Sequence, residues 1–302
     1  MKSSKINKTK DDFNERLQDV FKLMSIQGKY NIVGSSTLKG ILYASDIDLN
    51  EKTKVSKKHP FEYVYDTFVD KFKKAKSNPN MYITDFKAGV DEKGEPIKWT
   101  YDTLLENKDL FIKCLHTKSM IKLDIIFLLN GVYVDITEVY FLQIGNFKTY
   151  DDKELDSKSI LNELKKSYDE CIKEKMYFKA LKRLNSIMNM EHNNNKKKTT
   201  KITAFFNSQS GLLYKCYSDL QILLTLINNN FRKPPIQSIK DNLQIIKQML
   251  SIQTETKQNV SQIIDNICKK KKLNEMFIYI DKLSIYLAKL FNRDAKSFMD
   301  SL

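Results

Sequence analysis

Two carboxylates one residue apart, Asp46 and Asp48, stand among apolar neighbours in the run SDIDL. On a β-strand the side chains of residues i and i+2 project from the same face, so one strand can present both acids together. Carboxylate oxygens are the ligands that Mg²⁺ and related cations prefer. Phosphoryl transfer from a nucleoside triphosphate uses two cations about 4 Å apart, so the pair predicts a two-metal site.

A third acid is expected from a later strand. Asp124 lies in the apolar run Lys122–Ile126, where a charged side chain is costly unless it is paired or bound to metal. Asp135, between Val134 and Ile136, has similar surroundings. We place Asp124 first because its flanks are more apolar, and we keep Asp135 as the alternative third ligand.

A glycine turn precedes the acid pair. Tyr30–Val33 reads as a strand that runs into Gly34, Ser35 and Ser36, followed by a short helix over 37–41. Glycine permits close approach of the backbone to a ligand, and amides at a helix start bind phosphate. We therefore expect Gly34, Ser35 and Ser36 to hold a triphosphate.

Basic residues recur at helical spacing later in the chain. Lys179, Lys182 and Arg183 lie at i, i+3 and i+4 in a helical pattern, so all three can share one face. Such a face could bind the triphosphate, with Lys182 as the first choice and Lys179 as the second. A solvated basic face is the alternative.

The secondary structure expected around these residues differs between the two halves of the chain. The first half alternates helices and strands, with Asn130-Gly131 as a strong hairpin signal. Trp99 is interpreted as a buried anchor at a helix start, with base stacking as the alternative. The expected elements are a helix over 11–27, strands over 30–33, 46–49 and 81–90, a helix over 60–76, and hairpin strands over 118–129 and 132–142.

Long helical patterns follow, over 155–190, 212–230, 235–253, 256–272 and 273–298, with a solvated loop expected over 193–198. The sequence thus predicts an α+β fold. Strands and helices would alternate over residues 1–152, and an all-helical domain would span residues 153–302.

Charge points to a polyanionic partner. The net charge is +14, and residues 151–302 carry 27 Lys and Arg against 17 Asp and Glu. A basic excess favours RNA or DNA, because neutralised phosphates release counterions, although a lysine-rich proteome would give the same composition. The four cysteines are widely spaced, without a metal-ligand pattern. No apolar run approaches a membrane span, so we expect neither secretion nor membrane insertion.

The glycine turn and the acids together resemble a known signature. Val33–Ser36 with Ser45–Leu49 is similar to the hG[GS] and DhDh motifs of polymerase-β-like nucleotidyltransferases, and Lys122–Ile126 is similar to their third-aspartate strand. Within that superfamily, the chain most resembles the poly(A) polymerase catalytic subunits of large DNA viruses. The segments that carry this resemblance are Ser35–Asp48, Ile97–Thr100 and Tyr177–Ile187.

The resemblance implies a mixed-sheet catalytic domain over 1–152 and a helical domain over 153–302 that binds nucleotide or nucleic acid. It also implies a template-independent polynucleotide adenylyltransferase that adds AMP from ATP to single-stranded RNA 3′ ends in mRNA processing. It implies that Asp46, Asp48 and Asp124 hold two Mg²⁺ or Mn²⁺ ions, and that Gly34 and Ser35 contact the triphosphate. A viral protein of this kind would act in the host cytoplasm or the virion. Its oligomeric state stays open, with a homodimer among the options.

Two other functions remain open at this point. One is a non-catalytic partner or scaffold subunit that keeps the fold, although such a protein has no need of buried carboxylates. The other is transfer of a nucleotide to a protein or a small molecule. The basic helical half favours a nucleic-acid acceptor, because a small molecule needs no long positive surface.

Overall fold

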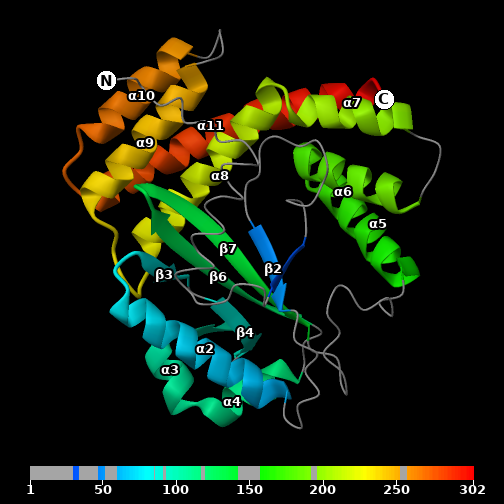
Figure 1. Ribbon diagram of the computed structural model, residues 1–302. Coiled ribbons are helices and arrows are strands. Elements are labelled where there is room, and N and C mark those ends of the chain that lie inside the picture. The colour runs from blue at the N-terminus through cyan, green and yellow to red at the C-terminus, as the bar shows by residue number, and fades with distance from the viewer. Residues whose placement is uncertain are drawn as a thin grey trace.

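The computed structural model describes residues 30–33, 47–51, 60–84, 86–90, 93–116, 120–141, 157–191, 196–251 and 257–302. The helices expected over 11–27 and 37–41 lie outside these residues. Figure 1 shows a central sheet with the helices of the first half on one side and the C-terminal helices on the other. The acids of interest therefore sit on a sheet between two helical layers.

The sheet has five strands in the order β1-β2-β7-β6-β3. β2 and β7 run parallel, whereas the other neighbouring pairs are antiparallel. The hairpin expected at Asn130-Gly131 is confirmed, and both residues have positive φ angles of 49° and 79°. The strands are β1 (Tyr30–Val33), β2 (Ile47–Glu51), β3 (Met81–Ile83), β6 (Met120–Leu129) and β7 (Val132–Phe141).

The single strand expected over 81–90 is wrong. β3 ends at Ile83 in the main sheet, and β4 (Phe86–Val90) pairs instead with β5 (Pro96–Trp99) in a separate two-stranded sheet. Beyond Ile83, the Thr84 backbone N–H still donates to the Asp124 carbonyl of β6 at 3.1 Å, which extends the contact with the main sheet by one residue. Trp99 is 1% exposed and donates its indole N–H to the Ala88 carbonyl at 2.8 Å, which confirms the buried anchor.

One face of the sheet packs against α2 (Pro60–Ser77), α3 (Tyr101–Glu106) and α4 (Lys108–Leu115). The core there is aromatic and aliphatic, but it encloses one ion pair. Lys71 Nζ donates to Glu138 Oε1 at 2.5 Å, and the Tyr140 hydroxyl donates to Glu138 Oε2 at 2.6 Å. The Lys71 and Glu138 side chains are 4% and 1% exposed. We call these three residues the Glu138 network.

The described chain is helical from Ser157 onward, with α8 and α11 packed along each other. The expected helix over 155–190 is broken into two, because Lys175 takes a left-handed φ of 59°. The loop expected over 193–198 is partly wrong, since α7 begins at Lys196. The helices are α5 (Ser157–Lys173), α6 (Tyr177–Met190), α7 (Lys196–Phe206), α8 (Gln209–Asn228), α9 (Ile236–Ser251), α10 (Lys257–Cys268) and α11 (Leu273–Asp300).

Three polar side chains from the helical half bind the strand half. Asn229 Nδ2 donates to the Ile83 carbonyl at 2.9 Å. Asn242 Nδ2 donates to the Gly131 carbonyl at 3.0 Å, and its Oδ1 accepts from a backbone N–H of β7. Arg232 donates to three carbonyls at the end of α2, at 2.8, 3.0 and 3.1 Å. These contacts fix the helical layer against one end of the sheet.

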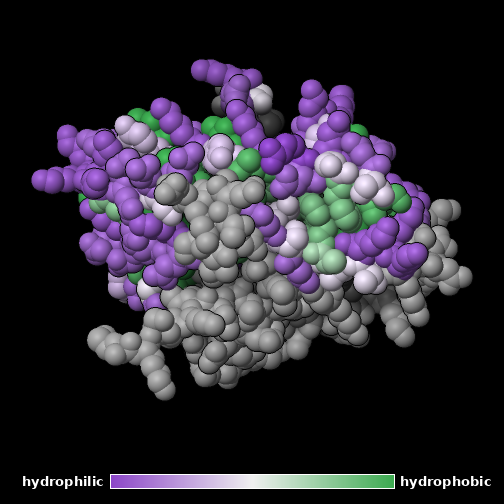
Figure 2. Space-filling model, turned by 90° about the horizontal axis from the view of Figure 1, so that it is seen from above, coloured by the Kyte–Doolittle hydropathy of each residue, from purple (hydrophilic) through white to green (hydrophobic). Residues whose placement is uncertain are grey.

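Polar side chains predominate on the described part of one face of the molecule (Figure 2). Figure 2 shows that the coloured part of the upper face is mostly hydrophilic, with hydrophobic side chains gathered in separate patches. Within the described ranges, no helix combines the length and the apolar character that a membrane crossing requires.

Candidate active site

Asp48 on β2, Thr137 on β7 and Asp124 on β6 form one row across three adjacent strands, because Thr137 pairs with both acids. Residues directly opposite on neighbouring strands project from the same face. The contacts agree with this, since Thr137 Oγ1 donates to Asp124 Oδ1 at 2.6 Å. Lys122 Nζ reaches the same side and lies 3.8 Å from Asp48 Oδ1. We call Asp48, Thr137 and Asp124 the acidic row.

The alternation along β6 explains why an acid occupies this face. Leu123, Ile125 and Phe127 point to the opposite face, where they are 0%, 0% and 1% exposed. Their burial against the α2 layer fixes the register, because a shift by one residue would move all three to the other face. Asp124 and Lys122 therefore reach the face that is turned to the long helices, where Asp124 is half-buried.

A cavity of about 200 Å³ separates this face from α8. Asp124 and Asp135 both line it, since Asp135 stands two residues before Thr137 on β7. Among the described residues the lining does not include Asp48, which lies further along the row. The structure thus brings Asp48, Asp124 and Asp135 onto one face and leaves both third-acid candidates open. The helical wall contributes Tyr214, Ser218, Gln221 and Thr225.

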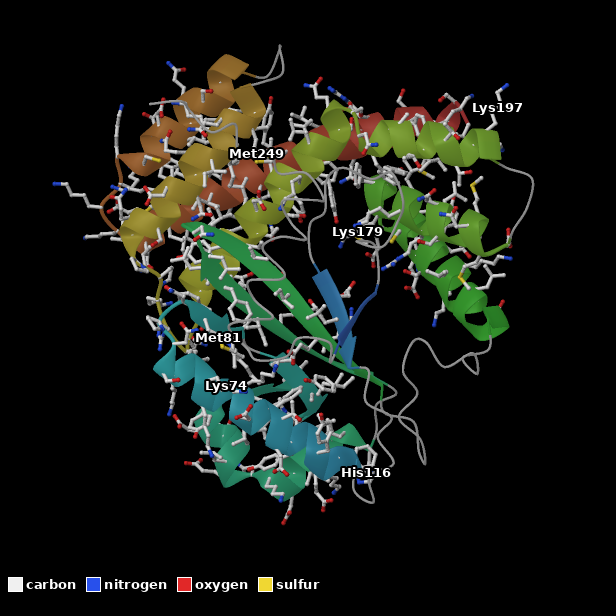
Figure 3. All side chains as sticks on the ribbon, in the orientation of Figure 1. Lys74, Met81, His116, Lys179, Lys197 and Met249 are labelled. Atoms are coloured by element: carbon white, nitrogen blue, oxygen red, sulfur yellow. The ribbon has the colours of Figure 1, made fainter. Side chains whose placement is uncertain are left out.

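Tyr214 links the cavity to α6. Lys182 Nζ lies 5.0 Å from the centroid of the Tyr214 ring, a favourable position for a cation over an aromatic face. Phe178 stacks on Tyr214 with centroids 4.3 Å apart and holds the ring in place. Lys182 is therefore beside the cavity, through its contact with Tyr214. Lys179 is exposed, and Figure 3 shows it near the start of α6.

The α8 residues that line the cavity are Tyr214, Ser218, Gln221, Ile222 and Thr225, and Tyr217 lies next to them on the same helix. Burial, and then the neighbouring Tyr214, raise the pKa of Tyr217 above its ordinary value of 10. The acids of the sheet face a cavity wall of phenol, hydroxyl and amide groups, with Lys182 beside it.

The chemistry of the donors fits hard cations, which take carboxylate and hydroxyl oxygens. Asp48 and Asp124 supply such oxygens on one face. Within the part of the chain that the structure describes, no group of three or more His, Cys, Asp or Glu residues could hold a metal ion. The predicted ligand Asp46, like Gly34, Ser35 and Ser36, lies outside the described residues.

Sequence reasoning missed the residues that surround the acids. Thr137 carries no motif, and its part follows only from the pairing of β7 with both β2 and β6. The α8 wall does leave a signal in the sequence, because Ser218, Gln221 and Thr225 recur at helical spacing. That signal gives no hint of which strand the helix faces.

Comparison with known proteins gives structural matches alone. No family model matches the chain, and no curated protein matches its sequence. The crystal structure of the M. chilensis Mg662 protein complexed with GTP is similar, with a TM-score of 0.68, 14% identity and coverage of 94% of this chain and 92% of that one.

Two further solved structures are described as a new nucleotidyl transferase encoded by a Megaviridae ORFan gene. One has a TM-score of 0.68 at 14% identity, covering 94% of this chain and 90% of that one. The other has a TM-score of 0.65 at 11% identity, covering 94% and 93%. The expected α+β fold, a mixed sheet followed by helices, is therefore the fold of structures described as nucleotidyl transferases.

Proposed function

We propose that this protein is a template-independent nucleotidyltransferase. The observation that carries the proposal is the acidic row, two carboxylates in register on the sheet face that borders a cavity. The fold supports it, because similar solved structures are described as nucleotidyl transferases and one is complexed with GTP. In this proposal residues 1–152 supply the reacting groups, and residues 153–302 supply the opposite wall and a basic surface.

Asp46, Asp48 and Asp124 would hold two Mg²⁺ or Mn²⁺ ions, with Asp135 as the alternative to Asp124. Bound there, the ions would neutralise phosphate charge and lower the pKa of the attacking hydroxyl. Thr137 fixes the Asp124 carboxylate by its hydrogen bond. The acceptor oxygen bonds to the α-phosphorus as the bond to the β-phosphate oxygen breaks. Pyrophosphate leaves, and the hydroxyl proton passes to a carboxylate of the row.

The nucleoside triphosphate would occupy the cavity between the acids and α8. Lys182 supports this placement, because its ammonium group lies over a ring of the cavity wall. Lys182 and Lys179 would neutralise phosphate charge from one side, and Gly34, Ser35 and Ser36 would bind the triphosphate through amides and hydroxyls. The neutral groups Ser218 and Gln221 would contact the base.

The finer proposal is a polynucleotide adenylyltransferase that adds AMP from ATP to single-stranded RNA 3′ ends. It rests on the resemblance to viral poly(A) polymerases and on the basic excess of the helical half. Because the Mg662 protein is complexed with GTP, the base preference for the donor nucleotide has to be determined by experiment. The alternatives are a non-catalytic subunit, or transfer to a protein or small molecule.

The decisive experiment incubates the protein with each labelled nucleoside triphosphate, Mg²⁺ or Mn²⁺, and a short RNA or DNA primer. We expect extension of RNA with ATP as the preferred donor. Asp48→Asn and Asp124→Asn should each lower the rate by about 100-fold or more, because each removes a metal ligand. Asp70→Asn, on the exposed surface of α2, is the matched control and should keep full activity. Activity that persists in both site variants would exclude the mechanism.

A further inference from the structure

A second cavity of about 300 Å³ lies at the β3 edge of the sheet. Its walls come from the C-terminal end of α2, the start of α3 and the segment that joins α8 to α9. Thr84 lines both this cavity and the one beside Asp124. The Thr84 backbone N–H and hydroxyl both donate to the Asp124 carbonyl, at 3.1 and 3.3 Å. The two cavities are therefore neighbours on either side of a residue fixed to the Asp124 strand.

Aromatic rings form much of the second cavity. Phe72 lies at its base and is 2% exposed, with Tyr101 at 5.9 Å and Phe231 at 6.0 Å between ring centroids. Tyr101 and Phe231 are only half-buried. Each can therefore offer ring surface to a planar ligand, which gains stacking energy and apolar burial. We call this space the Tyr101 cavity.

An exposed cation lines the Tyr101 cavity. Lys76 Nζ lies 3.9 Å from the centroid of the Tyr101 ring and 3.8 Å from Asp102 Oδ1. The Lys76 and Asp102 side chains are 53% and 79% exposed, and an ion pair so open to water is weak. Lys76 can therefore move off the face of the Tyr101 ring. A planar group can then stack on the ring, and Lys76 can bind a phosphate attached to that group.

The other walls are held in place before any ligand arrives. Asn229 is 3% exposed and accepts from the Phe231 backbone N–H at 2.7 Å, while its amide binds the end of β3. The Arg232 guanidinium is fixed to three carbonyls of α2, and it adds positive charge to the wall. A preformed site binds more tightly, because less ordering is required on binding.

From these contacts we propose that the Tyr101 cavity binds one unpaired nucleobase of the acceptor strand. The base would stack on Tyr101 and Phe231, and the adjoining phosphate would bind Lys76. Aromatic platforms interleaved with cations are how proteins hold single strands. The volume is at the lower end for ligand pockets, which suits a single base. This inference rests on the proposed function, since it places the base near the strand end that enters the acidic cavity.

The first test measures the affinity of a fluorescent single-stranded RNA 12-mer by anisotropy, together with the KM for the nucleoside triphosphate. Loss of one stacking platform, as in Tyr101→Leu or Phe231→Leu, should weaken strand binding about 5- to 100-fold. Tyr101→Phe should bind like wild type, and KM for the triphosphate should stay constant in all three. Two variants guard against misfolding, because unfolding of one leaves the other to decide.

The charge is tested by Lys76→Ala, with Lys74→Ala on the same helix as its control. Lys76→Ala should weaken binding and lower the slope of log affinity against log salt by about 1, as one phosphate contact is lost. Lys74 pairs with Asp70 on the surface and should have a much smaller effect. Equal effects of the two variants would argue for a diffuse basic surface rather than a site.

The position of the base is tested with 12-mers that carry one abasic residue at each position in turn. Wild type should lose affinity mainly at one position near the 3′ end, and Tyr101→Leu should be insensitive there. Uniform losses along the strand would overturn the proposal, and so would a variant that raises only the KM for the triphosphate. If wild type transfers no nucleotide but keeps the abasic pattern, the proposed function fails and the strand site stands.

Discussion

Thr137 donates its hydroxyl hydrogen to Asp124 Oδ1 across 2.6 Å, while its partner on the next strand is Asp48. One neutral residue thus separates two carboxylates and sets the direction of one of them. Like charges on neighbouring strands repel. The threonine between them lessens that cost and leaves the second Asp124 oxygen to a ligand.

Thr137→Val should therefore lower kcat for nucleotide transfer by about 10- to 100-fold through misplacement of Asp124. Thr137→Ser should restore most of the rate, because it keeps the hydroxyl. KM for the triphosphate should change little. Thr67→Val is the control, since the Thr67 hydroxyl binds only its own helix at the Tyr63 carbonyl among the contacts described here. Equal losses in kcat for both valine variants would contradict a positioning role.

The Glu138 network predicts a large stability effect on the opposite face. Lys71→Met leaves a buried carboxylate without its cation, and we expect a loss of about 3–5 kcal/mol in the free energy of unfolding. Lys74→Met breaks a surface pair with Asp70 and should cost at most about 1 kcal/mol. Urea unfolding monitored by circular dichroism measures both. Similar losses of unfolding free energy in the two variants would mean that the Lys71–Glu138 pair does not stabilise the core.

Two glycines with the same backbone conformation give a matched test of packing. Gly89 and Gly94 have φ angles of 78° and 82°, so alanine is strained at both. A Cβ on Gly89 would lie 2.2 Å from Cys114 Sγ, whereas nothing lies within 4 Å of one on Gly94. Gly89→Ala should cost about 1–3 kcal/mol more than Gly94→Ala in urea unfolding. Equal costs for the two variants would mean that the strain lies in the backbone alone and that the contact with Cys114 adds nothing.

The pair between α9 and α10 predicts a pH dependence of stability. Lys247 Nζ donates to both Asp265 oxygens at 2.6 Å, which lowers the pKa of Asp265 below 3.8. A carboxyl group whose pKa is lower in the folded than in the unfolded state stabilises the fold at pH values above its unfolded pKa. This stabilisation is lost as the pH falls through the pKa of the folded state. Lys247→Met should therefore lower Tm at neutral pH, and the difference from wild type should shrink below about pH 4. Lys240→Met, on the same helix, should show no such trend.

The sequence allows prediction of elements whose signals are local. Asn130-Gly131 predicted the hairpin because few other residues adopt the positive φ that its turn needs. The strand over 81–90 was wrong because its division depends on a partner, β5, that periodicity does not reveal. The break at Lys175 was missed because lysine in a left-handed conformation leaves no glycine or proline signal.

In the candidate site, too, the sequence predicts residues with a local signal and misses those that depend on contacts between distant segments. Asp48 and Asp124 could be found from the sequence, because an acid in an apolar strand is costly without a partner. The choice between Asp124 and Asp135 could not be made, since both acids project from the same sheet face. The α8 residues that face these acids lie some eighty residues after Asp135 in the chain. The spacing of residues within α8 gives no information about which distant strand the helix packs against.

Asn229 and Asn242 have a consequence for folding as well as for shape. Both are buried, and both bond to the backbone of the strand half, while Tyr82, Ile126 and Tyr133 of the sheet belong to the same core as α8 and α9. A chain cut near residue 152 would leave these amides without their carbonyls and this core open to water. We therefore expect the two halves to unfold together, as one cooperative unit rather than in two steps.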